Sequence, residues 1–146
     1  MSKRVVIQDT EPNAYKAMFG LEKYLATSNL DILLIELIKI RASQINGCAY
    51  CIEIHTKDAI TNGETQRRIF ALSAWWESPL FSEKEKVVLK MTEEITLITE
   101  KGLTETTYSE AEKFFSEHEI AQIIMQIGTI NLWNRIAVST HLMHKI

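Results

Sequence analysis

Apolar residues recur every three or four positions along most of this chain, which is the spacing of one face of an α-helix. Strand-like alternation of apolar and polar residues is scarce. Only 5 Gly and 2 Pro interrupt the 146 residues, so long helices meet few breaks. The pattern therefore predicts an all-α protein of about six to seven helices.

Capping and turn residues mark where the predicted helices begin and end. Ser82 and Ser116 are each followed three residues later by glutamate, as in a capping box, and Gly47, Gly63 and Gly102 are typical of helix ends. The predicted helices cover about residues 12–26, 31–44, 48–62, 64–74, 82–101, 104–115 and 116–139. Their predicted buried faces include Met18, Leu21, Tyr24 and Leu25 in the first helix and Val88, Met91, Ile95 and Ile98 in the fifth.

Length, charge and the composition of the apolar runs limit the class of protein. The 146 residues, 46% of them hydrophobic, suit one domain over residues 1–146 with a single core. The net charge of -3, without a basic stripe, disfavours nucleic acid and anionic membranes as partners. The first residues lack a signal-peptide core, and charges such as Glu36 and Lys39 interrupt the longest apolar runs. We therefore expect a cytoplasmic protein without a membrane span.

The two cysteines of the chain, Cys48 and Cys51, lie at the start of a predicted helix, and His55 follows four residues after Cys51. Positions three and four apart share a face of a helix, so these side chains are expected to lie along one stripe. A thiol reacts as its thiolate, which a helix N-terminus or a neighbouring base favours. Because His55 is one turn from Cys51 and two turns from Cys48, Cys51 is the predicted nucleophile of a redox pair.

Glu36 is the candidate partner of His55. It lies in a largely apolar segment, where a lone carboxylate usually turns to solvent or pairs with a neighbour such as Lys39. If the helix over 31–44 folds back through the Asn46–Gly47 turn, Glu36 can instead face His55 and orient the imidazole.

Other interpretations of the cysteine pair remain open. Two free cysteines can simply be small buried residues. A zinc site would need a fourth ligand beside the cysteines and His55, and Glu36 is one candidate. The remaining histidines, His118, His141 and His144, are distant in the sequence, so no bound metal is expected. A thioredoxin-like motif would need a βαβ context, which the flanking helices argue against.

Eight residues of the central segment form a spaced pattern: Glu36, Arg41, Ser43, Asn46, Cys48, Tyr50, Cys51 and His55. This pattern resembles the core signature of the AhpD-like alkylhydroperoxidases, within the carboxymuconolactone decarboxylase family. Trp75 with Glu77, the segment 83–96 and Asn131–Arg135 also resemble the smaller single-domain members, so the similarity covers most of residues 12–140. The resemblance implies an AhpD-like helical fold and a homo-oligomer, either a dimer, a trimer or a hexamer.

The resemblance also implies a role for each residue of the site. In the family, the residue matching Cys51 is oxidised by a peroxide to a sulfenic acid, and the residue matching Cys48 supplies a proton and closes the disulfide. The residues matching His55 and Glu36 form the proton relay. The expected function is therefore a thiol-dependent alkylhydroperoxidase, a peroxiredoxin-type antioxidant enzyme. It would take a hydroperoxide and an external dithiol or protein reductant of the dihydrolipoamide type, with no cofactor beyond the redox-active disulfide.

The chain departs from the family pattern at one position that bears on the relay. The best-studied members carry a histidine between the two cysteines, where this chain has Ala49 and Tyr50, so that imidazole is missing. The decarboxylase branch lacks the cysteine pair, which disfavours lactone chemistry here. The alternative functions are a non-catalytic redox-sensing or oligomerisation protein and a carboxymuconolactone decarboxylase-type enzyme.

Overall fold

The computed structural model describes residues 4–144, whose regular structure is helical, and the predicted all-α fold is confirmed. The helices are α1 (Ile7–Thr10), α2 (Pro12–Leu25), α3 (Ile32–Ile45), α4 (Ala49–Thr61), α5 (Gln66–Ala71), α6 (Glu83–Thr96), α7 (Glu105–Glu112) and α8 (Glu117–Thr140), with the 3-10 turn η1 (Leu72–Ala74) after α5. Among the described residues, no helix has the length and apolar character needed to cross a membrane.

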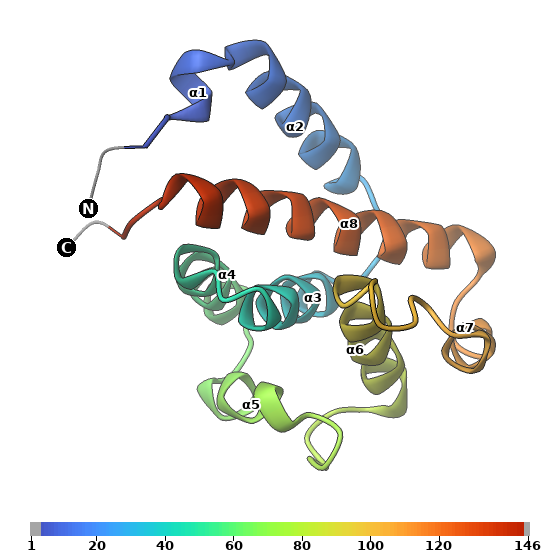
Figure 1. Ribbon diagram of the computed structural model, residues 1–146. Coiled ribbons are helices and arrows are strands. Elements are labelled where there is room, and N and C mark those ends of the chain that lie inside the picture. The colour runs from blue at the N-terminus through green and yellow to red at the C-terminus, as the bar shows by residue number, and fades with distance from the viewer. Residues whose placement is uncertain (1–3, 145–146) are drawn as a thin grey trace.

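Helix α8 runs through the middle of the molecule, with α1 and α2 on one side and α3, α4 and α6 on the other (Figure 1). Helices α3 and α4 form a helical hairpin, and α3 also packs against α6 and α8. The first described residues and the end of α8 lie at the same end of the molecule (Figure 1). This arrangement places the start of α4, with its cysteines, beside the C-terminal part of α8, where Cys48 and Cys51 form a buried cluster with Ala137.

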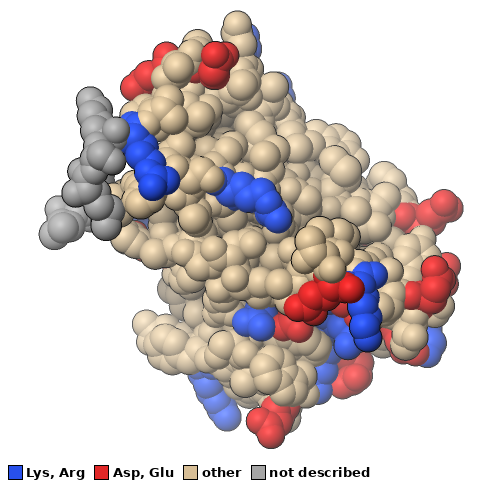
Figure 2. All heavy atoms as spheres, viewed as in Figure 1, with Lys and Arg blue, Asp and Glu red and all other residues tan. Residues whose placement is uncertain are grey.

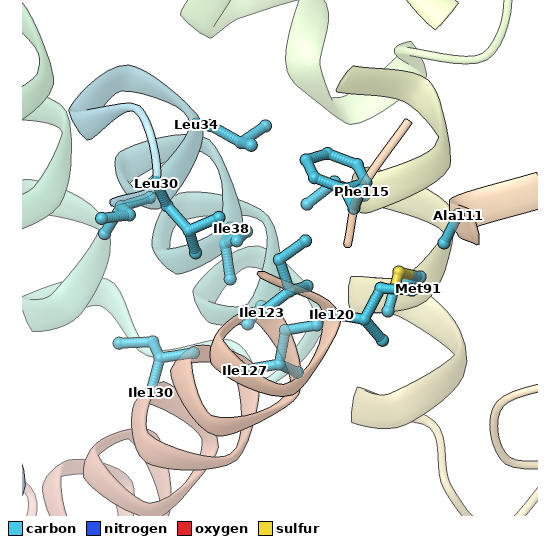
Figure 3. Close-up of a cluster of buried hydrophobic side chains, with 13 residues drawn as sticks. Leu30, Leu34, Ile38, Met91, Ala111, Phe115, Ile120, Ile123, Ile127 and Ile130 are labelled. Carbon is cyan, nitrogen blue, oxygen red and sulfur yellow. The ribbon is translucent and has the colours of Figure 1, made fainter. Parts of the chain in front are cut away.

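The main core lies between α3, α6, α7 and α8 (Figure 3). Leu34 and Ile38 of α3 belong to the same buried cluster as Ile123 and Ile127 of α8 and Met91 of α6. Each of these side chains is 5% exposed or less, which is typical of a close-packed interior. The central helices are therefore held by apolar packing, and this rigid frame carries the site described below.

Helix α3 meets apolar neighbours on a second side as well. The second cluster of buried residues consists of Leu37, Ile40, Ala59, Ile69, Leu72, Trp75, Phe81 and Leu89. Because α3 is apolar on most of its circumference, its few polar residues are buried with it. Glu36 is 3% exposed and Ser43 is fully buried. Buried polar groups need hydrogen-bond partners. Glu36 is bound by Lys39 and His55, and Ser43 accepts from Asn134.

Charged side chains on the face seen in Figure 1 are scattered, and positive and negative groups lie side by side near α6 (Figure 2). Opposite charges also pair between helices: a side-chain nitrogen of Arg41 in α3 lies 2.8 Å from a carboxylate oxygen of Glu93 in α6. The described residues on this face form no continuous basic surface of the kind that binds nucleic acid.

Four predicted helix starts are confirmed by their capping hydrogen bonds. The side chains of Asp31, Ser82, Thr104 and Ser116 accept backbone N–H groups from the first turns of α3, α6, α7 and α8. Ser82 and Ser116 form complete capping boxes with the glutamates three residues later. Local sequence therefore predicts these helix starts well, since each cap depends only on residues within one turn.

The end of the predicted helix over 82–101 is wrong. Helix α6 ends earlier, at Thr96, because the next residue, Leu97, has a ψ of 45° and leaves the helical region. Glu94 accepts the backbone N–H of Thr104 at 2.9 Å and so ties the following loop back to α6. Ile98, which was expected in the buried stripe, lies in this loop and is 57% exposed.

Other differences concern short elements. The predicted helix over 64–74 is divided into α5 and η1, and α5 starts only after Thr65, whose hydroxyl accepts the N–H of Arg68. Helix α7 ends at Glu112, before the predicted limit. Tyr24 is 50% exposed and does not belong to the buried face of α2. Helix α1 was not predicted, because its four residues include no buried side chain and so leave no periodic signal.

A network of side-chain amides joins the turn between α3 and α4 to α8. Asn46 Nδ2 donates to the Oδ1 atoms of Asn131 at 3.0 Å and Asn134 at 2.9 Å. Asn134 Nδ2 in turn donates to Ser43 Oγ at 3.0 Å, and Asn134 is fully buried. Because Asn46 lies two residues before Cys48, this network fixes where α4 begins.

We expect Asn134→Ala to lower the free energy of unfolding by about 2–3 kcal/mol, because it removes the buried donor to the hydroxyl of Ser43 and one of the two acceptors of the Asn46 amide, which keeps only Asn131. Urea unfolding monitored by circular dichroism measures this loss. Asn62→Ala is the matched control, since Asn62 donates to a backbone carbonyl at an exposed position, and it should cost less than about 0.5 kcal/mol. Equal losses in the two variants would contradict a stabilising role for the network.

Candidate active site

The cysteine pair lies where the chain turns from α3 into α4. Gly47 has a φ of 65°, a conformation that favours glycine, and it reverses the chain direction. Cys48 then caps α4, with its Sγ accepting the N–H of Cys51 at 3.3 Å. The helix therefore starts at Ala49 rather than at the first cysteine, because Cys48 has the dihedral angles of a cap. Cys48 and Cys51 are joined by a disulfide, and both are buried.

Packing of α3 on α4 brings Glu36 and His55 together. His55 Nδ1 lies 3.2 Å from Glu36 Oε2, and Lys39 Nζ donates to Glu36 Oε1 at 3.2 Å. Glu36 is 3% exposed, so the carboxylate has protein partners in place of water. Because Glu36 holds Nδ1, Nε2 is the nitrogen of His55 that remains for acid–base chemistry.

The ionisation of Glu36 follows from the balance between its burial and its partners. Burial raises the pKa of Glu36, because desolvation disfavours the carboxylate. The hydrogen bond from His55 and the positive charge of Lys39 act in the opposite direction, and the partners together outweigh burial. The pKa of Glu36 therefore lies below its ordinary value of 4.5, so the group is ionised at neutral pH. An ionised Glu36 can stabilise an imidazolium that forms on His55.

The lowered pKa predicts that Glu36 contributes to stability in a pH-dependent way. A carboxyl group whose pKa is lower in the folded state stabilises the fold above its unfolded pKa, and this contribution is lost as the pH falls through the folded value. We expect the free energy of unfolding to be higher for the wild type than for Glu36→Gln at neutral pH. The difference should shrink below about pH 4.5. Urea unfolding of both proteins over that range measures it, and a difference that grows on acidification would contradict the assignment.

Cys51 and His55 line a pocket of about 790 Å³, a volume typical of small-molecule sites. Cys48 does not line this pocket and is 2% exposed, in a cluster with Ala137 of α8. Cys51 is also buried, at 5% exposed, and belongs to the same cluster, so the two cysteines differ in that Cys51 alone borders the pocket. Cys51 is the member of the pair that a molecule in the pocket can reach.

The walls of the pocket come from α2, α3, α4 and α8 and from the two ends of the described chain. Tyr15 and Phe19 of α2 and Trp133 of α8 form an aromatic part of the wall. Residues 4–8 and 141–143 cover another part, and both segments lie at the same end of α8 (Figure 1). The pocket therefore depends on parts of the chain that are far apart in the sequence.

Polar contacts hold these end segments in place. Arg4 Nη1 donates to the backbone oxygen of Ser139 at 2.8 Å, which joins the first described residue to α8. His144 contacts the carboxylate of Glu53 on α4. Both contacts are exposed or half-exposed, so each one contributes little to overall stability and serves mainly to position the segment.

Glu36, His55 and Asp58 are the one group of possible metal ligands found among the described residues, with ligand atoms within 4.8 Å of one another. Both oxygens of Glu36 already have partners, and the cysteine sulfurs are bonded to each other. A cation at this position would have to compete with the ammonium group of Lys39. The zinc set considered from the sequence, with both cysteines as ligands, is therefore not assembled in this oxidised state.

Sequence reasoning missed the pocket wall and Asp58. Tyr15 and Phe19 are four residues apart and so share a face of α2, but this signal does not show what the face covers. Asp58 lies three residues after His55 on the same face of α4, and this spacing is enough to predict that the two side chains are neighbours. Lys39 was weighed as an alternative partner of Glu36, and the structure shows Lys39 and His55 bound to it at once.

Comparison with known proteins places the chain in one family. Residues 12–94, more than half of the chain, match the model of the carboxymuconolactone decarboxylase family. The uncharacterized protein YdfG of Bacillus subtilis (strain 168) is 41% identical over 139 residues, which cover 95% of each chain.

Solved structures give the same result. A protein of unknown function from Agrobacterium tumefaciens, for which the name antioxidant defence protein AhpD has been suggested, is 38% identical with a TM-score of 0.95 over 99% of each chain. The debrominase Bmp8, crystallised with 2,3,4-tribromopyrrole, is 18% identical with a TM-score of 0.84 over 94% of this chain and 74% of that one, which shows a shared fold alone. The chain therefore belongs to the carboxymuconolactone decarboxylase family, as an AhpD-like member.

Proposed function

We propose that this protein is a thiol-dependent hydroperoxide reductase in which Cys51 is the thiol that reacts with the peroxide. The observation that supports this most strongly is that Cys51 and His55 line one pocket while the buried carboxylate of Glu36 holds the imidazole. A cysteine pair able to form a disulfide, a base oriented by a carboxylate and a pocket beside the reactive sulfur are the parts that such an enzyme needs.

Oxidation of the protein starts from the dithiol state. His55 accepts the proton of Cys51, and Glu36 stabilises the imidazolium. The thiolate of Cys51 attacks the terminal oxygen of the hydroperoxide, so that an S–O bond forms and the O–O bond breaks. The departing alkoxide takes the proton held by His55 and leaves as the alcohol. Cys51 is then a sulfenic acid.

Cys48 resolves the sulfenic acid. Its sulfur attacks the sulfur of Cys51, the S–S bond forms, and the hydroxyl group leaves as water with the proton of Cys48. The N-terminus of α4 favours a thiolate on Cys48, because the N–H of Cys51 is directed at its sulfur. The disulfide that closes in this step is the state in which the structure holds the pair.

An external dithiol completes the cycle. It attacks the sulfur of Cys51, the cysteine that lines the pocket, and Cys48 leaves as the thiolate that the helix N-terminus stabilises. The second thiol of the reductant then releases the mixed disulfide. In one turnover, a hydroperoxide and a dithiol give an alcohol, water and an oxidised dithiol.

Consumption of tert-butyl hydroperoxide with dihydrolipoamide as reductant tests the proposal. We expect many equivalents of peroxide per chain, with one dithiol oxidised for each peroxide. The double variant Cys48→Ser/Cys51→Ser measures the uncatalysed reaction between reductant and peroxide. If the wild type consumed one equivalent and then stopped in the presence of excess dithiol, a redox sensor would be the correct description, and no reaction above background would refute the proposal.

A further inference from the structure

We propose that the pocket selects hydroperoxides that carry an aromatic ring, and that Tyr15, Phe19 and Trp133 recognise the ring. The reaction at the peroxide group rests on the function proposed above. Recognition of the ring rests on other residues, which lie on α2 and α8 rather than on the cysteine-bearing helix. The two parts can therefore be tested separately.

The three aromatic side chains form one cluster in the pocket wall. The ring centroids lie 5.2 Å apart for Tyr15 and Phe19, 5.4 Å for Tyr15 and Trp133, and 5.7 Å for Phe19 and Trp133, and each pair meets edge to face. Trp133 Nε1 donates to Glu22 Oε1 at 2.8 Å, which fixes the orientation of the indole. A further aromatic ring that enters the pocket can make the same edge-to-face contacts, which an aliphatic group of equal size cannot make.

The charged groups around the pocket already have partners. Lys39 is bound to the buried carboxylate of Glu36, Glu22 accepts from Trp133, and Arg4 donates to a backbone oxygen of α8. Lys39 faces the opposite charge of Glu36, and Glu22 and Arg4 keep their charges but are held by neutral partners, so the rest of the pocket wall is mainly apolar and aromatic. An uncharged aromatic substrate fits this surface better than a carboxylate such as a fatty acid hydroperoxide.

The size of the pocket also separates the substrate classes. Hydrogen peroxide needs little more room than a water molecule, and its binding would leave most of the 790 Å³ hydrated. An aryl hydroperoxide of the size of cumene hydroperoxide displaces water from the aromatic wall while its peroxide group lies at Cys51 and His55. Binding energy is therefore available to the aromatic substrate and not to hydrogen peroxide.

Phe19 is the position that tests this most cleanly, because it is 55% exposed and its truncation removes no core packing. We expect the wild type to have a higher kcat/KM for cumene hydroperoxide than for hydrogen peroxide. Phe19→Ala should raise the KM for cumene hydroperoxide about 3- to 10-fold and leave kcat/KM for hydrogen peroxide unchanged. Phe19→Leu keeps the apolar bulk and should show most of the same loss. Phe70→Ala removes a phenylalanine that is 76% exposed on α5, outside this pocket. It should leave KM and kcat/KM unchanged for both peroxides.

Equal effects of Phe19→Ala on both peroxides, or no preference of the wild type for cumene hydroperoxide, would overturn the inference. Binding of 2-phenyl-2-propanol, the unreactive alcohol product, tests ring recognition independently of peroxide turnover. We expect isothermal titration to show binding that is weakened in Phe19→Ala and kept in Phe70→Ala, even if no peroxide is turned over. Absence of binding to the wild type would refute ring recognition, whatever the outcome of the peroxidase assay.

Discussion

Cys51→Ser is expected to lower hydroperoxide turnover at least about a thousandfold, to the background reaction between dithiol and peroxide. A serine hydroxyl is not ionised near neutral pH and forms neither a sulfenic acid nor a disulfide. We do not expect the remaining thiol to take its place, because Cys48 does not line the pocket. Steady-state consumption of tert-butyl hydroperoxide with dihydrolipoamide measures the loss.

Cys48→Ser is the matched variant, and it should stop the cycle at a later step. Cys51 still reacts with about one equivalent of peroxide, but the sulfenic acid has no partner and disulfide-linked turnover ends. Circular dichroism of both variants checks that each one folds. Full turnover by Cys51→Ser together with loss in Cys48→Ser would reverse the two roles, and full turnover by both variants would exclude the disulfide cycle.

His55→Asn is expected to slow the oxidation of Cys51 by peroxide about 100- to 10,000-fold at neutral pH, which is the range that a positioned general base supplies. Asparagine can replace the imidazole in contact with Glu36 but cannot accept the proton of the thiol. Glu36→Gln should cause a smaller loss of the same kind, because the imidazole remains while its charged partner becomes neutral. Stopped-flow measurement of a single oxidation of the reduced protein gives these rates without interference from the reductant.

High pH distinguishes a base from a structural residue at this position. Above the pKa of the thiol the thiolate forms without help, so the rate of His55→Asn should approach that of the wild type. His118→Asn is the control, since His118 lies exposed at the start of α8 with Gln122 as its partner, and its rate should be unchanged. A loss for His55→Asn that is the same at all pH values would indicate a purely structural role.

The placement of the cysteine pair and His55 could be predicted from the sequence because it depends on short spacings. Cys51 and His55 lie one turn apart on α4 and Cys48 caps its start, so helical geometry places the three close together. The contact of Glu36 with His55 required one further assumption, that the Asn46–Gly47 turn folds the two helices together. The structure contains that hairpin, and within it Glu36 contacts His55.

The pocket could not be predicted, because its wall joins distant parts of the chain. Tyr15 and Trp133 are separated by most of the sequence, and their contact depends on how α2 packs against α8. The end of α6 could not be predicted for the same reason. It depends on the hydrogen bond from the backbone N–H of Thr104, at the end of the next loop, to Glu94. The single domain over residues 1–146, the homo-oligomer and the cytoplasmic location stay predictions.

Mapping of the sulfenic acid tests most directly whether Cys51 is the thiol that meets the peroxide. Reduced Cys48→Ser and Cys51→Ser are each treated with one equivalent of hydroperoxide and trapped with dimedone, and the labelled residue is identified by mass spectrometry. We predict rapid labelling of Cys51 in Cys48→Ser and at most slow labelling of Cys48 in Cys51→Ser. Rapid labelling of Cys48 with an unlabelled Cys51 would contradict the proposed mechanism.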